Sequence, residues 1–250
     1  MKNERHKLLF LFALVCLLPK LCNAGQLADF ETKLELYRND KLHGEMVFKL
    51  TTGDKHWTMH SSTEGTKGVA SWLGLKESST GEGDWFEGQA RPLRYERNVR
   101  VIKKMHWSAE FDWDKGEVHT VYPDGESTLP LKPGVVDESA IGLRVRAGLK
   151  NGENEWFLDL VDEEKIEEAH FRTRSVENVQ TALGCMKVHV VEKVRWEGNP
   201  RYTRTYYAAD HEFAPVLLEH GKYDGDHIEG RVVSLSINGK PVAAGPDCPP

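Results

Sequence analysis

The chain has 250 residues, of which 33 are Lys or Arg and 39 are Asp or Glu, so its formal net charge at pH 7 is −6. An acidic composition argues against nucleic acid and against anionic membrane surfaces as partners, because both select basic patches. The length suits one sizeable domain or two small ones.

The first 24 residues have the pattern of a cleavable secretory signal peptide. A basic start precedes residues 8–18, which are all apolar, and Cys22-Asn23-Ala24 places small residues at the cleavage positions. The apolar run is shorter than the ~20 residues that a transmembrane helix needs, and no later run is longer. We therefore expect cleavage after Ala24, export to the periplasm and no transmembrane segment in the mature chain. Because the first 24 residues hold four Lys or Arg and one Glu, residues 25–250 carry a net charge of −9.

Alternation of apolar and polar residues recurs along the rest of the chain and predicts β-strands. Residues 30–36 and 187–196 are clear cases, and pairs that favour tight hairpin turns, such as Asp124-Gly125 and Asn238-Gly239, lie between such segments. An amphipathic sheet of this size covers its apolar face by curling into a barrel or half-barrel, or by packing as a sandwich. We predict a mainly β fold: a single curved antiparallel sheet (an open barrel or half-barrel) with one short helix. Residues 25–250 form one domain with a short flexible C-terminal tail.

The stretch 74–91 departs from the strand pattern. It is rich in Gly and Ser, with Trp85-Phe86 embedded in it. We predict a long loop here, and long loops in compact domains are often functional or mobile.

The segment 105–117 combines acids with aromatic residues. Residues two apart in a strand share a face and lie roughly 7 Å apart, so Glu110, Asp112 and Asp114 share one face. The opposite face carries Met105, Trp107, Ala109, Phe111 and Trp113. The spacing of Glu110 and Asp112 is compatible with the carboxylates of an inverting glycosidase, which are roughly 6.5–9.5 Å apart. A catalytic acid also needs an environment that raises its pKa, whereas solvation alone places acids on the wet face of a strand. The solvated strand is the favoured interpretation.

Residues 137–149 fit two patterns. Apolar residues alternate as in a strand, but Ile141, Val145 and Leu149 are also four apart, as on one helix face. Asp137 can cap such a helix and Glu138 favours the positive end of its dipole, so a helix is preferred.

Cys185 and Cys248 are the two cysteines of the predicted mature chain. Exported proteins fold where disulfides persist, so a bridge between them is one interpretation. The other is a buried thiol at Cys185 and a free Cys248 in the C-terminal tail. The sequence leaves both open.

Sequence motifs for catalysis, phosphate binding and metal binding are missing. The chain contains neither G-x-S-x-G nor S-x-x-K, and neither of the common glycine-rich phosphate loops. His56 and His60 lack the adjacent Glu of a zinc-protease motif, and two cysteines give no zinc signature. We predict no catalytic residue, no metal and no cofactor.

Several landmarks of the sequence occur in a recognisable order. They are Gly88 with Arg91-Pro92-Leu93-Arg94-Tyr95, Phe111-Asp112-Trp113, Gly134 with Asp137, Ser139 and Leu143-Arg144, Thr181 to Val188, and Ala214 to Glu219 before Tyr223-Asp224-Gly225. This order resembles a family of exported bacterial proteins called domain of unknown function 3108, over about residues 28–240. Tyr206-Tyr207 stands where the family usually has a Trp, and Ser139 lies one position early. The resemblance implies an exported, β-rich half-barrel like that of periplasmic lipoprotein carriers, and it carries over no catalytic residue.

These observations favour a non-enzymatic periplasmic protein that binds a lipid, another amphiphile or an envelope component on the concave face of its sheet. Trp107, Phe111 and Trp113 are the predicted ligand-lining residues. One alternative is an assembly factor that contacts another envelope protein through a sheet edge or the 74–91 segment. The other is a glycan-acting hydrolase that uses Glu110 and Asp112.

Overall fold

The computed structural model describes residues 27–68, 71 and 74–249. The predicted signal peptide, residues 1–24, lies outside these residues. The described strands are β1 (Phe30–Arg38), β2 (Lys41–Thr52), β3 (His56–Gly65), β4 (Lys76–Phe86), β5 (Gln89–Arg100), β6 (Lys104–Asp112), β7 (Glu117–Tyr122), β8 (Gly125–Pro130), β9 (Glu155–Asp162), β10 (Lys165–Thr181), β11 (Gly184–Lys193), β12 (Arg201–Ala208), β13 (Ala214–Lys222), β14 (His227–Ile237) and β15 (Lys240–Pro241). The helix α2 spans Glu138–Lys150.

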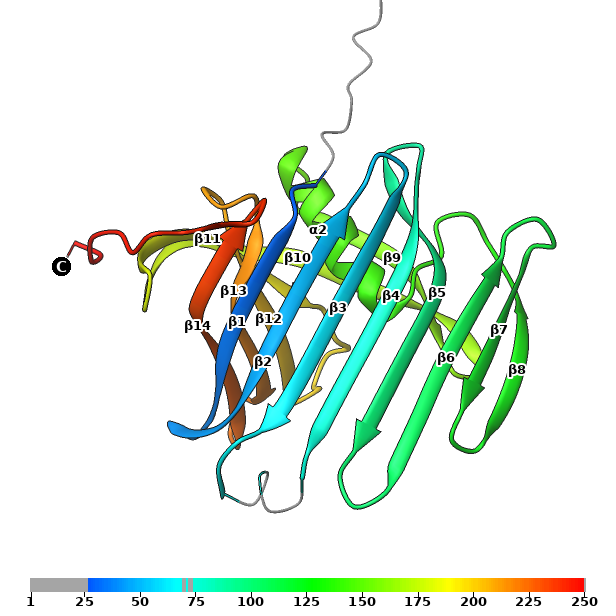
Figure 1. Cartoon of the computed structure of the whole chain (residues 1–250), viewed down its shortest axis with the longest axis horizontal. Coiled ribbons are helices and arrows are strands. Elements are labelled where there is room, and N and C mark those ends of the chain that lie inside the picture. The colour runs from blue at the N-terminus through cyan, green and yellow to red at the C-terminus, as the bar shows by residue number, and fades with distance from the viewer. Residues whose placement is uncertain (1–26, 69–70, 72–73, 250) are drawn as a thin grey trace, which may run out of the picture.

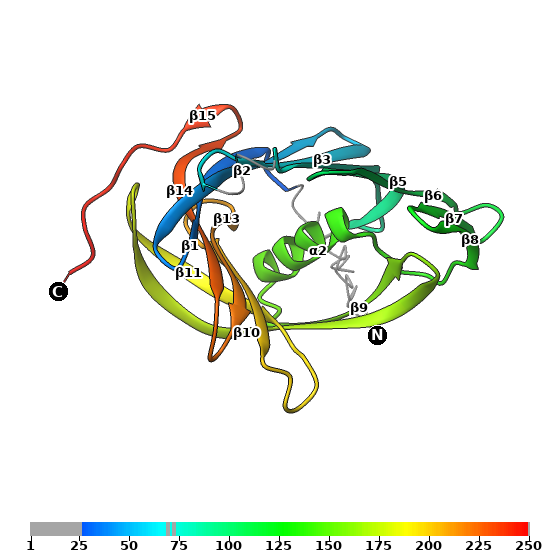
Figure 2. The same cartoon turned by 90° about the horizontal axis from the view of Figure 1, so that it is seen from below.

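All fifteen of these strands belong to one antiparallel sheet. Their order is β8-β7-β6-β5-β4-β3-β2-β1-β14-β13-β12-β11-β10-β9, with β15 beside β14. The sheet curls without closing, so β8 and β9 are its two ends (Figures 1 and 2). The predicted class, a curved and open antiparallel sheet with one helix, is confirmed.

Alternation along the strands decides which face is apolar. In β1, Phe30, Thr32 and Leu34 are buried, while Glu31 between them is exposed. The tight turn expected at Asn238-Gly239 joins β14 to β15, and both residues have positive φ. Two consecutive positive φ angles match the right-handed twist of the paired strands.

Helix α2 occupies the inside of the curved sheet (Figure 2). It begins at Asp137, whose side chain accepts a hydrogen bond of 2.8 Å from the Ala140 backbone N–H. The helix predicted over 137–149 is therefore confirmed. Its buried residues are Ala140, Leu143, Val145, Arg146, Gly148 and Leu149. The apolar side chains among them pack into a large core with side chains from both halves of the sheet. The apolar face of the sheet is thus covered by the chain's own helix.

The prediction of a long loop over 74–91 is wrong. This segment is most of the β4–β5 hairpin, whose turn at Glu87-Gly88 has positive φ at both residues. Its small residues have a packing role: a Cβ on Gly81 would collide with Ser139 of α2, and one on Gly83 would collide with Trp57. Small residues are therefore needed here because other side chains lie close to the β4 backbone. A composition rich in Gly and Ser is the same for such a strand as for a loop.

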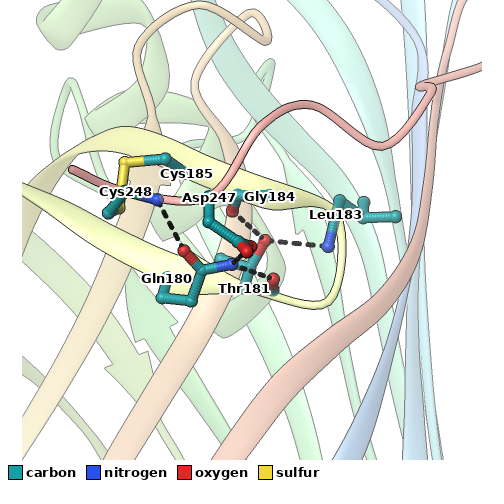
Figure 3. Close-up of a disulfide and its surroundings, with 7 residues drawn as sticks. All are labelled: Gln180, Thr181, Leu183, Gly184, Cys185, Asp247 and Cys248. Atoms are coloured by element: carbon teal, nitrogen blue, oxygen red, sulfur yellow. Dashed lines mark hydrogen bonds between the residues drawn. A yellow bond between two sulfur atoms is a disulfide. The ribbon is translucent and has the colours of Figure 1, made fainter. Parts of the chain in front are cut away.

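The C-terminal segment is fastened to the tip of the β10–β11 hairpin. A disulfide joins Cys185 to Cys248, and the Gln180 side chain donates to Asp247 and accepts from the Cys248 backbone N–H (Figure 3). Backbone hydrogen bonds add Gly245 to Leu183 and Cys185 to Pro246. The tail expected to be flexible is thus tethered at several points.

Candidate functional site

The aromatic residues predicted to line a ligand site, on β6 and directly after it, lie in different surroundings. Phe111 is 7% exposed and packs in a smaller core with Tyr95, Ala109, Val118 and Val135. A side chain in this setting fills the concave side of the sheet and does not border an open cavity there.

Trp107 links β6 to the β9–β10 turn across the open side of the sheet. Its indole Nε1 donates a hydrogen bond of 2.9 Å to Glu163 Oε1, in the turn between β9 and β10. The Thr120 hydroxyl of β7 donates to the Glu163 carbonyl oxygen of the same turn at 2.6 Å. Side chains therefore connect the two ends of the sheet where no backbone ladder closes it.

The outer face, which is turned away from α2, carries an open hollow of about 690 Å³ over β4 to β8. We call it the outer depression. It is bordered by Glu82, Arg91, Leu93, Arg94, Glu110, Phe111, Asp112, Trp113, Asp114, Lys115, Glu117, His119 and Thr128. Its volume lies in the range of ~300–1,000 Å³ that is usual for small-molecule sites.

Strand register builds the floor of the outer depression. Glu82, Arg94, Glu110, His119 and Thr128 are directly paired positions on five successive strands, so they form one polar row across the sheet. Arg94 Nη2 donates to Glu110 Oε1 at 3.1 Å, and His119 Nδ1 lies 3.4 Å from the Thr128 hydroxyl. Paired strand positions lie within side-chain reach, which is why residues far apart in sequence meet here.

An aromatic ledge flanks this polar row. The Arg91 guanidinium lies 4.4 Å from the centre of the Phe86 ring and 5.7 Å from that of Trp113. Asp84 holds the guanidinium in place with two hydrogen bonds of 2.8 and 2.6 Å. Trp113 is oriented by its indole N–H, which donates to the Pro92 carbonyl oxygen at 2.7 Å. Leu93 extends the apolar surface, and Phe86 and Leu93 are 49% and 36% exposed.

The charged groups of the outer depression are largely paired. Lys115 lies 2.7 Å from the Asp112 carboxylate, and hydrogen bonding from Lys115 lowers the pKa of Asp112. Hydrogen bonding to Asp84 raises the pKa of Arg91. Five acids and three Lys or Arg border the hollow, so its net charge is negative. Ionised and paired groups of this kind suit the recognition of a polar ligand.

The structure brings together four of the five residues singled out on β6 and directly after it. Glu110, Phe111, Asp112 and Trp113 all border the outer depression, whereas Trp107 does not. The row partners Glu82, Arg94 and His119 were missed, because only strand register places them opposite Glu110. Glu82 lies within the segment 74–91, which was predicted to be a loop, so its place in a strand was not foreseen.

The described residues offer neither a metal site nor a membrane-spanning helix. In the part of the chain that the structure describes, no three His, Cys, Asp or Glu side chains are grouped to hold a metal ion. No helix among the described residues has the length and apolar character needed to cross a bilayer.

Comparison with known families decides the membership of this chain. A model of the family described as "Protein of unknown function (DUF3108)" matches residues 34–227, which is more than half of the chain. The chain belongs to the DUF3108 family. The resemblance drawn from the order of sequence landmarks is thereby confirmed. No curated protein matches this DUF3108 chain.

Three solved structures are similar to this chain to different extents. A beta-barrel-like protein of the domain of unknown function DUF1849 from Brucella abortus aligns with a TM-score of 0.57 at 12% identity, over 86% of this chain and 100% of that one. A "putative lipoprotein" from Parabacteroides distasonis aligns with a TM-score of 0.36 at 9% identity, over 83% and 95% of the two chains. A DUF1329 family protein from Desulfovibrio piger aligns with a TM-score of 0.21 at 8% identity, over 87% and 88%. The first of these shows that the DUF3108 chain shares a barrel-like fold with a DUF1849 protein.

Proposed function

We propose that this DUF3108 protein is exported to the periplasm and binds an amphiphilic, envelope-derived ligand without converting it. The observation that carries the proposal is an aromatic ledge beside a polar row: Leu93 and Trp113 border the outer depression, and Phe86 adjoins it through the Arg91 guanidinium. Such a surface matches a molecule with an apolar part and a polar head. The signal-peptide pattern and the disulfide between Cys185 and Cys248 support export, because disulfides persist in oxidising compartments.

The charges of the outer depression specify the kind of head group. With acids outnumbering Lys and Arg along its border, an anionic head would meet net repulsion. Hydroxyl-rich or zwitterionic heads can instead hydrogen-bond with the Arg94–Glu110 pair and with His119. The apolar part would lie along Phe86, Leu93 and Trp113.

The first experiment titrates the purified full chain with two amphiphiles that share a dodecyl tail, dodecylphosphocholine and dodecyl sulfate, below micelle formation. The zwitterionic compound is expected to bind more tightly. A Phe86→Ser/Leu93→Ser double variant should weaken its affinity by about tenfold, since part of two apolar contacts is lost. Both side chains are substantially exposed, so folding should be preserved.

The matched control is Phe157→Ser, which removes a 60% exposed aromatic side chain from β9. It should leave the affinity unchanged. Equal weakening by the control and the double variant, or no binding of either amphiphile, would overturn the proposal. Native mass spectrometry of protein purified from its own envelope, with bound mass expected, provides an independent check.

A glycan-acting hydrolase is the second candidate, because Glu110 and Asp112 both border the same hollow. It is less favoured, since a general acid needs a raised pKa and the pKa of Asp112 is lowered. A Glu110→Gln/Asp112→Asn variant tests it against any hydrolytic activity found on envelope glycans. Full activity in that variant would dismiss this candidate.

A further inference from the structure

One end of the sheet collects the connections β1–β2, β5–β6, β11–β12 and β13–β14, together with the described residues of β3–β4. We call this end the basic rim. Strand register defines it through the pairs Arg201–Lys222, Gly221–His227, Ile228–Arg38, Arg38–Lys41, Glu64–Lys76, Lys76–Arg100 and Arg100–Lys104. Figure 1 shows the turns β1–β2 and β5–β6 together at the lower end of the sheet.

Cations accumulate on the basic rim although the chain as a whole is acidic. Its Lys and Arg side chains outside any ion pair with a described carboxylate are Lys41, Lys67, Arg100, Lys103, Lys104, Arg195, Arg201 and Lys222. Two of its acids are neutralised locally, since Asp226 pairs with Arg38 and Asp40 pairs with Arg231. Glu197 and Asp224 are the remaining acids of these connections. The connections that define the rim therefore carry more unpaired Lys and Arg than unpaired acids, and the β7–β8 turn at the same end adds Asp124, on a molecule of formal charge −6.

Large apolar side chains project from the same rim. Ile102 is 87% exposed at the apex of the β5–β6 turn, and Trp196 is 75% exposed between β11 and β12. Tyr223 and Ile228 are 59% and 44% exposed beside them. The backbone N–H of Tyr223 donates to the Pro200 carbonyl oxygen at 3.0 Å, which fixes the β13–β14 turn against the β11–β12 connection. Exposed Ile and Trp at loop apices are costly in water and favourable at a lipid interface.

We propose that the basic rim docks on the surface of an anionic phospholipid bilayer. The cations would lie at the phosphate level, and Ile102, Trp196 and Tyr223 would enter the head-group region. Clustered Lys and Arg beside interfacial aromatic residues are the chemistry that recognises such a surface. Exposed apolar apices favour lipid over nucleic acid, whose backbone offers them no apolar partner.

This inference does not rest on the proposed ligand site. The outer depression is bordered by Arg91 and Arg94 near the start of β5, whereas the basic rim begins at Arg100, the last residue of that strand. Failure of one proposal therefore leaves the other unaffected.

Vesicle flotation of the full chain, with its disulfide intact, tests the proposal. Vesicles of phosphatidylcholine mixed with phosphatidylglycerol are expected to carry the protein, and pure phosphatidylcholine vesicles should carry much less. Reversing the charge at Lys103→Glu/Lys104→Glu should weaken binding by at least about tenfold, because each cation near an anionic surface contributes separately. Salt should weaken the binding of the unmodified chain.

The matched charge control is Lys55→Glu/Lys240→Glu, which makes the same change in net charge at the opposite end of the strands. It should bind like the unmodified chain. Ile102→Ser should remove most of the binding that survives high salt, whereas Val176→Ser, at a 48% exposed position on β10, should not. No flotation with anionic vesicles, or equal losses in both charge-reversed pairs, would overturn the proposal.

Discussion

Asp137 is a buried carboxyl group with an unequal set of partners. Its Oδ1 accepts hydrogen bonds from the Ala140 backbone N–H and from the Ser139 hydroxyl at 2.6 Å, while Oδ2 has no partner. The residue is 2% exposed, and burial raises its pKa to about 6. One residue thus starts the helix that fills the sheet and also keeps its proton to a higher pH than an ordinary Asp does.

The raised pKa of Asp137 predicts a pH-dependent stability. Above the unfolded-state pKa, which is near the ordinary Asp value of 3.8, the folded state retains the proton longer. The free energy of unfolding should therefore fall as pH rises from about 4 to about 6 and stay lower above that. A difference of two pKa units corresponds to roughly 3 kcal/mol at most.

Asp137→Asn should flatten this part of the pH profile, because the amide keeps a capping oxygen and does not ionise. Urea unfolding at several pH values should show a loss between pH 4.5 and 7.5 that is smaller than that of the unmodified protein by about 2 kcal/mol. Asp124→Asn, in an exposed turn, is the control and should keep the original profile. An unchanged profile in the Asp137 variant would show that ionisation of Asp137 does not cause this loss of stability.

At the scale of elements, the approach of α2 to β4 depends on one missing side chain. A Cβ at Gly81 would collide with the Ser139 side chain, whereas a Cβ at Gly142 of α2 meets nothing within 4 Å. Gly81→Ala should therefore lower the free energy of unfolding by about 2 kcal/mol through overpacking. Gly142→Ala should raise it by about 0.5–1 kcal/mol through helix propensity. Chemical denaturation of both variants measures these opposite signs, and a neutral Gly81→Ala would refute the packing argument.

The β4–β5 hairpin shows why element prediction failed where it did. Gly81 and Gly83 face Ser139 and Trp57, so tertiary contact selects small residues in the middle of a strand. Strand β6 has no such contact to satisfy, and its simple alternation predicted Ala109 and Phe111 as buried and Glu110 as exposed. Periodicity therefore succeeds where a strand meets ordinary side chains and fails where another element lies close to its backbone.

At the scale of the whole molecule, the disulfide joins the end of the chain to a distant hairpin. Cys185 and Cys248 are 63 positions apart, and a cross-link over such a loop restricts the unfolded chain. Reduction should lower the free energy of unfolding by about 2–4 kcal/mol. After reduction, the rate of amide hydrogen exchange should rise at residues 180–185 and 242–248, where the tail is bonded to the hairpin. A Cys185→Ser/Cys248→Ser variant should behave like reduced protein and respond no further to reductant. Equal stability of oxidised and reduced protein would show that the bridge contributes nothing.

The distribution of charge also belongs to this scale. Net charge argued against anionic surfaces, yet strand register places cations from five connections at one end of the sheet. Lys103-Lys104 is the longest basic run in the sequence, and its neighbours on the rim, such as Lys41 and Lys222, are far away along the chain. Net charge sums over the molecule, whereas docking depends on the local potential.

The amino-acid sequence by itself determined the β class, the open curved sheet, the helix after Asp137 and the family, because alternation, turn residues and capping are local properties. Only the tertiary structure decided that α2 fills the concave face, that Glu110 meets Arg94 and His119, and that the two cysteines meet. These outcomes depend on register and on contacts between distant segments, which no local pattern encodes. Ala109 and Phe111 of β6 became part of a packed core for the same reason, and the polar row of the candidate site came to lie on the opposite face of the sheet.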